Sequence, residues 1–167
     1  SPVAPARFTG KFGERIDNGS LVISAELDVR MPGRYSVEAN LFTADDRPVA
    51  HVRAEARLTG GKHSVDLLFF GKIFHDQGAG GSYVLKGLRG IQDTGPLDPE
   101  LLNRPVAEVE KLIEKTRTTE PDRRVIPRFK ESFKTKTYRL EDFSDAEHDS
   151  DLKRERIAEL EKLAAQD

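Results

Sequence analysis

Hydrophobic and polar residues alternate along about the first half of this chain. In the segment 21–29, for example, Leu21 and Ile23 alternate with Ser24 and Glu26. A period of two gives a β-strand one buried face and one solvent-exposed face. The pattern therefore predicts a succession of strands that share a core.

Turns rich in Gly, Asn, Asp and Pro separate the alternating segments. The Asp-Asn-Gly turn at 17–19 favours a tight hairpin, because Asn-Gly tolerates positive φ angles. Gly71 is expected to mark a bulge or bend, and 77–81 a flexible loop. The predicted strands cover 7–16, 21–29, 34–44, 49–58, 62–70, 82–91 and 129–140. Because short turns join successive strands, the predicted fold is a mainly β, antiparallel, immunoglobulin-like β-sandwich.

The pattern changes after Gly95. Asp98 and Pro99 combine an N-cap residue with proline at the first helical position, and Pro105 offers a second helix start. A helical insertion over about 98–115 is therefore expected, followed by an exposed loop from Thr116 to Pro127.

A further helix is expected at the end of the sequence. Ser144 and Glu147 form a capping box, which predicts a C-terminal helix over about 145–165. The resulting organisation is a linker remnant at 1–6, a β-sandwich domain at 7–143 with the helical insertion at 98–127, and a C-terminal helix at 144–167.

Composition narrows the range of partners. Charged residues make up 34% of the 167 residues, yet the formal net charge is only -2, so the whole molecule has no strong field to attract nucleic acid or anionic lipid. The chain has no cysteine, which excludes disulfides and thiolate metal sites. The segment 65–70, which is apolar apart from Asp66, is too short to span a membrane.

Alternating acidic residues near the end of the chain are weak candidates for calcium ligands: Asp145, Glu147, Asp149 and Asp151. An EF-hand loop counted from the first of them would need glycine and glutamate where Ser150 and Arg156 stand. The cluster also fits an N-terminal helix turn, where acidic side chains complement the helix dipole. No cofactor is expected.

Catalytic motifs are not apparent in the sequence. The four histidines are scattered, and His75 beside Asp76 is the best acid-base pair among them. Adjacent residues on a strand point to opposite faces, so this pair would need a loop geometry. We therefore expect a protein that is not an enzyme.

Charge is unevenly spread towards the end of the chain. The segment 115–139 has nine basic and three acidic residues, whereas 140–167 is acidic. The two blocks could neutralise each other, or the basic block could bind an acidic partner. The candidate partner contacts are Arg123, Arg124 and Arg128 from the basic block and Leu152, Ile157 and Leu160 from the apolar stripe of the last helix.

Several segments rich in glycine, tyrosine and alternating residues carry a resemblance: 33–37, 41–42, 47–50, 71–73, 81–85 and 88–90. Over about Ser20 to Gly90 the sequence resembles immunoglobulin-like β-sandwich modules of bacterial surface and secreted proteins. The resemblance implies an extracytoplasmic protein, in the periplasm or at the cell surface, and a spacer or adhesive role. It supplies no functional residues that could be transferred.

The expected function is a non-catalytic interaction or spacer module that binds another macromolecule or a neighbouring domain. The alternative is a calcium- or carbohydrate-binding accessory module of a secreted hydrolase or adhesin. A protein partner is favoured and a polysaccharide is the second choice. Nucleic acid is not expected, because no aromatic-interleaved base-reading pattern accompanies the arginines.

Overall fold

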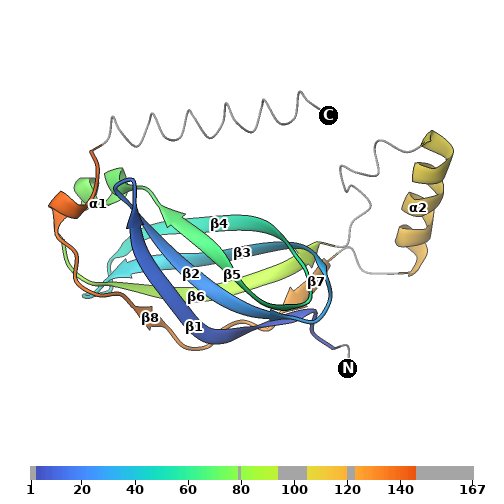
Figure 1. Ribbon diagram of the computed structural model, residues 1–167, viewed down its shortest axis with the longest axis horizontal. Coiled ribbons are helices and arrows are strands. Elements are labelled where there is room, and N and C mark those ends of the chain that lie inside the picture. Colours follow the sequence, from blue (N-terminus) through green and yellow to red (C-terminus); the bar gives the residue numbers. More distant parts are fainter. Residues whose placement is uncertain (1–2, 79, 94–104, 120–122, 146–167) are drawn as a thin grey trace.

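The computed structural model describes residues 3–78, 80–93, 105–119 and 123–145, and within them two antiparallel β-sheets share one core (Figure 1). The strands are β1 (Ala6–Asp17), β2 (Ser20–Val29), β3 (Gly33–Thr43), β4 (Pro48–Leu58), β5 (Gly61–Phe69), β6 (Tyr83–Asp93), β7 (Arg123–Ile126) and β8 (Phe133–Lys134). The helices are α1 (Gly71–Gln77), α2 (Val106–Thr119) and the 3-10 helix η2 (Leu140–Asp142).

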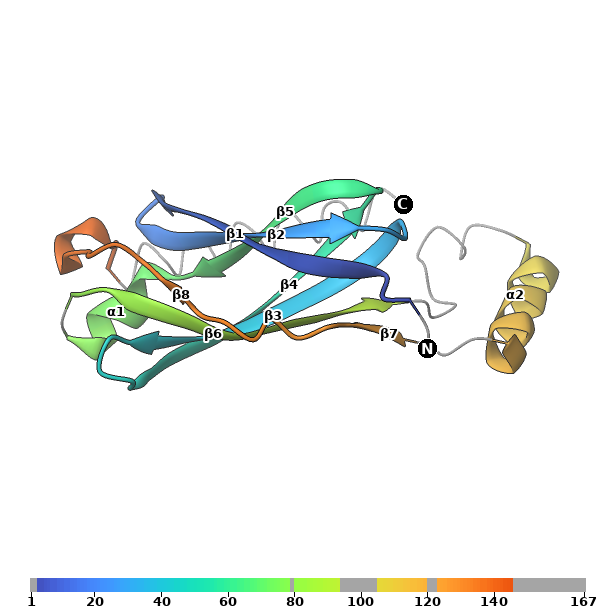
Figure 2. The same ribbon diagram turned by 90° about the horizontal axis from the view of Figure 1, so that it is seen from below.

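The two sheets form two layers. The smaller sheet has the strand order β1-β2-β5, and the larger sheet has the order β4-β3-β6-β7, with β8 also paired to β6. Figure 2 shows the smaller sheet above the larger one, with α1 and α2 at opposite ends of the layers. All strand pairs are antiparallel, which confirms the prediction of a mainly β, antiparallel fold.

The first hairpin was predicted correctly. Asp17 of β1 pairs with Ser20 of β2, and the turn residues between them, Asn18 and Gly19, have φ angles of 48° and 76°. Positive φ at both central residues matches the right-handed twist of the flanking strands, which is why an Asn-Gly pair fits this position.

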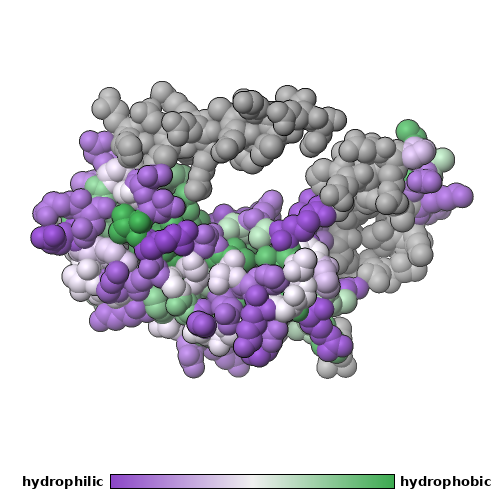
Figure 3. All heavy atoms as spheres, viewed as in Figure 1, coloured by the Kyte–Doolittle hydropathy of each residue, from purple (hydrophilic) through white to green (hydrophobic). Residues whose placement is uncertain are grey.

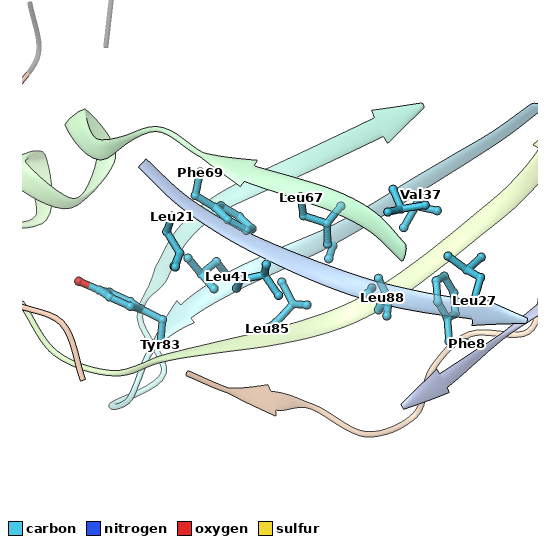
Figure 4. Packing of buried hydrophobic residues seen from close by; sticks show 14 of the residues in the cluster. Phe8, Leu21, Leu27, Val37, Leu41, Leu67, Phe69, Tyr83, Leu85 and Leu88 are labelled. Carbon is cyan, nitrogen blue, oxygen red and sulfur yellow. The ribbon is translucent and has the colours of Figure 1, made fainter. Parts of the chain in front are cut away.

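The core lies between the sheets (Figure 4). Leu21, Ile23 and Leu27, which form the predicted inward row of β2, are completely buried, as are Val37 and Leu41 from the facing sheet. Full burial of each such side chain contributes about 1.5–3 kcal/mol to the free energy of folding. Hydrophobic alternation thus identified both the strands and their inward faces.

The prediction of a bulge or bend at Gly71 was wrong, because α1 begins there. The helix ends at Gly78, which has a φ of 78° and donates to the carbonyl oxygens of Phe74 and His75. The backbone at Gly71 lies against Gly19 and Ser144, where a Cβ atom would collide with backbone atoms. A short helix with one buried aromatic residue carries little periodic signal, so local sequence did not reveal it.

The predicted exposed loop from Thr116 to Pro127 was also wrong. Helix α2 continues to Thr119, and β7 pairs with β6 through Gly90 and Ile126. Ile126 is completely buried. This strand forms because β6 offers unpaired backbone groups at its edge. Such pairing with a distant segment cannot be predicted from a short polar sequence alone.

The long strand predicted over 129–140 is shorter in the structure. Only β8 pairs with β6, and Tyr138 makes an isolated bridge to Gly81. Elsewhere the segment makes separate contacts: the Thr135 amide donates to the Tyr83 carbonyl oxygen at 2.8 Å, and Glu14 Oε1 accepts hydrogen bonds from the Lys136 amide at 3.0 Å and from the Tyr138 hydroxyl at 2.6 Å. The segment still closes one side of the sandwich, where Phe133 stacks on Phe12 with 4.7 Å between ring centroids.

Two sequence expectations lie wholly or partly outside the described residues. Residues 98–104 of the expected helical insertion fall there, as does the C-terminal helix except for Asp145. Among the residues that the structure does describe, no helix is both long and apolar enough to cross a membrane.

Candidate functional site

The outer faces of the two sheets differ in charge balance. On the smaller sheet, Arg7 pairs with Asp28 at 3.2 Å and Arg15 pairs with Asp66 at 2.9 Å. A hydrogen bond from Arg15 lowers the pKa of Asp66 below its ordinary value, and partial burial opposes this shift. Figure 3, which looks onto the side of the smaller sheet, shows mostly hydrophilic residues with hydrophobic ones between them.

The outer face of the larger sheet carries more arginines than carboxylates. Its side chains alternate with the core residues of β3, β4, β6 and β7, and the pairing register places them in adjacent rows. We call this surface the basic face, and its residues are Arg34, Ser36, Glu38, Asn40, His51, Arg53, Glu55, Arg57, Arg89, Ile91, Asp93, Arg123 and Val125.

One carboxylate organises the middle of the basic face. Glu38 Oε1 accepts a hydrogen bond from Arg89 Nε at 2.6 Å, and Glu38 Oε2 lies 3.3 Å from His51 Nε2. The other ring nitrogen of His51, Nδ1, lies 2.7 Å from Asn40 Oδ1. Hydrogen bonds and ion pairs therefore link β3, β4 and β6 across the sheet.

Next to this network is a hollow of about 270 Å³. Its lining combines basic, polar and apolar side chains: Ser36, Glu38, Arg53, Arg89, Gly90, Ile91, Arg123 and Val125. Val125 is 69% exposed although it lies in a paired strand. An exposed apolar side chain surrounded by arginines is typical of protein-binding surfaces, in which arginine is enriched.

A second, larger hollow of about 740 Å³ lies where the chain between β7 and β8 bends away from β6. The residues that line it are Lys86, Gly87, Arg128, Phe129, Lys130, Glu131 and Ser132. Lys86 is paired with Asp46 at 2.6 Å and lies over the ring of Phe42. The basic character of the face thus continues into this hollow.

The structure places the predicted contact arginines differently from one another. Arg123 is exposed on the basic face, and Arg128 is exposed at the larger hollow. Arg124 is half-buried, and its Nη1 atom lies 3.2 Å from the sulfur of Met31. Since neighbours in a strand point to opposite faces, Arg123 and Arg124 cannot both contact a partner on the same face of β7.

The other candidate residues from the sequence give no site within the described part of the chain. Glu147, Asp149, Asp151 and the three apolar contact candidates Leu152, Ile157 and Leu160 lie outside the described residues, and Asp145 is exposed. Within the described ranges, no group of three or more His, Asp or Glu side chains could hold a metal ion.

His75 has a structural partner. Its Nε2 atom lies 2.9 Å from the carbonyl oxygen of Phe143, so the ring joins α1 to the chain after η2. This is a contact between two parts of the fold rather than the acid-base arrangement with Asp76 that the sequence raised.

Sequence reasoning missed Arg53 and Arg89, which contribute to the smaller hollow. Both are outward residues of correctly predicted strands, so their exposure was evident. Their proximity depends on the order of strands in the sheet, because both pair with Glu38 of β3 from opposite sides.

The fold and this surface define a mainly β domain of two antiparallel sheets with one basic outer face. A family model described as the C-terminal domain of a domain of unknown function, DUF4785, matches residues 5–106, and the chain belongs to this family. No curated protein and no solved structure matches the chain. The matched region includes β1 to β6, whereas β7 and β8 follow it.

Proposed function

We propose that this domain is a non-catalytic β-sandwich interaction module of a bacterial extracytoplasmic protein, and that it binds another protein or a neighbouring domain through the basic face. The resemblance of 20–90 to immunoglobulin-like surface modules supports the class of protein and its location. The observation that carries the choice of surface is the exposed Val125 beside Arg53, Arg89 and Arg123 around one hollow.

The chemistry of this surface favours an acidic partner with an apolar contact. Arg53 donates from Nε to Ser36 Oγ at 2.7 Å and from Nη2 to Glu55 at 3.2 Å, so its guanidinium is held in a fixed position on the sheet. A pre-ordered arginine loses less conformational entropy when it binds a carboxylate. Val125 and Ile91 supply the apolar area beside it.

Site-specific photo-crosslinking in the full-length protein tests this proposal. A photoreactive residue at Val125 is expected to yield one discrete crosslinked product, and the substitutions Arg53→Glu and Arg123→Glu are expected to abolish it. The matched control is the same residue at Ser64, which is exposed on β5 of the smaller sheet. Equal crosslinking from Val125 and Ser64, or a product that survives the charge reversals, would contradict the proposed surface.

A further inference from the structure

Strand β6 has a bulge at Gly87, in the middle of the larger sheet. Glu38 of β3 pairs with Arg89, but Asn40 pairs with Lys86, so Gly87 and Leu88 together face one residue of β3. Gly87 has a φ of 67°, in the left-handed region that favours glycine. Such bulges redirect side chains and are frequent beside functional sites.

Three side-chain nitrogens converge over Gly87. A Cβ atom added to this glycine would lie 3.1 Å from Arg128 Nη2, 3.3 Å from Asn40 Nδ2 and 3.5 Å from Arg89 Nη1. The three come from β3, β6 and the chain that follows β7. All three are hydrogen-bond donors, and none can act as an acceptor.

The neighbouring contacts fix these donors while leaving hydrogens available. The side-chain oxygen of Asn40, Oδ1, lies 2.7 Å from His51 Nδ1. This contact directs the side-chain nitrogen of Asn40, Nδ2, towards Gly87. Arg89 Nη1 donates to the Gly87 carbonyl oxygen at 3.0 Å, and its second hydrogen remains for another acceptor.

The local charge favours an anion at this point. Two guanidinium groups face the same small space, and Glu38, the carboxylate that Arg89 binds, is shared between Arg89 and His51. Within the described residues, no carboxylate pairs with Arg128. The space borders the 740 Å³ hollow, whose lining includes Lys130 and Glu131 as well as Lys86, which is paired with Asp46.

We propose that the bulge at Gly87 is an oxyanion-binding site, which takes a carboxylate or sulfate group through Arg128, Arg89 and Asn40. Fixed donors from arginine and amide groups around one point are the arrangement that recognises such groups. The inference deepens the proposed function and rests on it for the identity of the macromolecule that carries the group. On this proposal, the bulge is where the basic face recognises a particular group of its partner.

Titration of the full chain with sodium sulfate, and separately with sodium acetate, tests the site. Amide and side-chain NMR signals are followed at constant ionic strength, with sodium chloride as the reference salt. We expect saturable shifts at Gly87 and at the side-chain amide of Asn40 with at least one of the two anions. Shifts that are diffuse, fail to saturate, or appear equally with chloride would overturn the proposal.

Three variants separate a defined site from general charge attraction. Arg128→Gln removes an exposed donor, and Asn40→Asp keeps the acceptor for His51 while replacing the amide donor with a carboxylate; each should weaken anion binding about tenfold. The control is Arg7→Gln, because Arg7 is 64% exposed on the outer face of the smaller sheet, away from Gly87. It should bind the anion as the original chain does.

The outcomes also separate this inference from the proposed function. Anion binding is measured without any partner. If no saturable binding is seen, the proposed site at the bulge is wrong, even if Val125 crosslinks specifically. Conversely, a crosslink that survives charge reversal would contradict the proposed surface. Saturable sulfate binding in the same protein would still support the anion site. Unchanged anion binding in Arg128→Gln would refute the assignment of donors.

Discussion

The ring of Phe143 stacks on the ring of Phe74, with 4.1 Å between the centroids and 15° between the ring planes. Phe74 belongs to α1 and is completely buried, and Phe143 follows η2 and is 5% exposed. The chain that follows β8 therefore completes the core at the end of the sandwich where α1 lies.

Replacement of Phe143 by alanine should be strongly destabilising. A buried phenylalanine replaced by alanine loses transfer free energy and leaves a cavity, at a cost of about 3–5 kcal/mol. Urea denaturation monitored by circular dichroism should show this loss for Phe143→Ala. Glu141→Ala is the control, since its side chain is 77% exposed and its loss should change stability by less than about 0.5 kcal/mol. Equal effects of the two changes would contradict the role of the stacked pair.

The structural domain should require residues beyond the family match. The match ends at residue 106, but Ile126, Tyr138 and Phe143 of the buried core come later in the chain. A chain that ends at residue 106 also exposes the backbone edge of β6, which promotes association. We expect it to lack the cooperative thermal transition of the 167-residue chain and to bind a hydrophobic dye. A cooperative, monomeric shorter chain would show that the later strands are dispensable.

The three tyrosines should respond differently to loss of their hydroxyl groups. Tyr138 donates to Glu14 at 2.6 Å, and Tyr35 donates to the carbonyl oxygens of Pro5 and Met31. The hydroxyl of Tyr83 is buried without a hydrogen-bond partner in the described part of the chain. Tyr138→Phe should therefore lower the free energy of unfolding by about 1.5–3 kcal/mol, because the acceptor is charged.

Tyr83→Phe should leave stability unchanged or raise it, because a buried unpaired hydroxyl costs about 1–3 kcal/mol. Denaturant titrations of both single variants beside the original chain give the comparison. If Tyr83→Phe is as destabilising as Tyr138→Phe, then the Tyr83 hydroxyl has a partner that stabilises the fold.

Alkaline pH should unfold the domain. Burial, followed by the hydrogen bond to Glu14, raises the pKa of Tyr138 far above its ordinary value, and burial also raises the pKa values of Tyr35 and Tyr83. A folded-state pKa above the unfolded value means that stability is fully present below about pH 10 and is lost as pH rises further. Each tyrosine lowers the free energy of unfolding by up to about 1.4 kcal/mol per pH unit in that range.

Stability measured between pH 8 and 11.5 checks this expectation, together with tyrosinate absorbance at 295 nm. Ionisation of the phenols should coincide with loss of the β-sheet circular dichroism signal. Smooth titration of all three tyrosines near pH 10 with the fold intact would show that they are open to solvent.

The strands from β1 to β6 could be predicted because the signal for each is local. In β2, residues such as Leu21 and Ile23 alternate with Ser24 and Glu26, and the structure buries the hydrophobic row as expected. The turn at Asn18 was equally local, since its chemistry depends on backbone torsion angles alone.

Later parts of the chain depend on contacts that the sequence does not display. The four residues of β7 include two arginines, and they form a strand because β6 accepts them. The segment after Phe129 has the alternation of a strand, but after β8 its contacts include the Glu14 side chain and the bridge at Gly81 in place of a continuous ladder. The convergence of Arg89, Arg128 and Asn40 over Gly87 depends on strand register and a bulge, neither of which a linear pattern specifies.

Ser144 and Ala6, near the two ends of the described chain, lie at opposite ends of β1, and this affects how the domain responds to mechanical load. The Ser144 amide donates to the carbonyl oxygen of Gly19 at the β1–β2 turn, whereas Ala6 begins β1 at its far end, opposite Val29. A force that pulls these two points apart acts along β1, so its ladder of hydrogen bonds to β2 is loaded in shear and must break together. That geometry resists extension far better than one in which the pairs open in sequence.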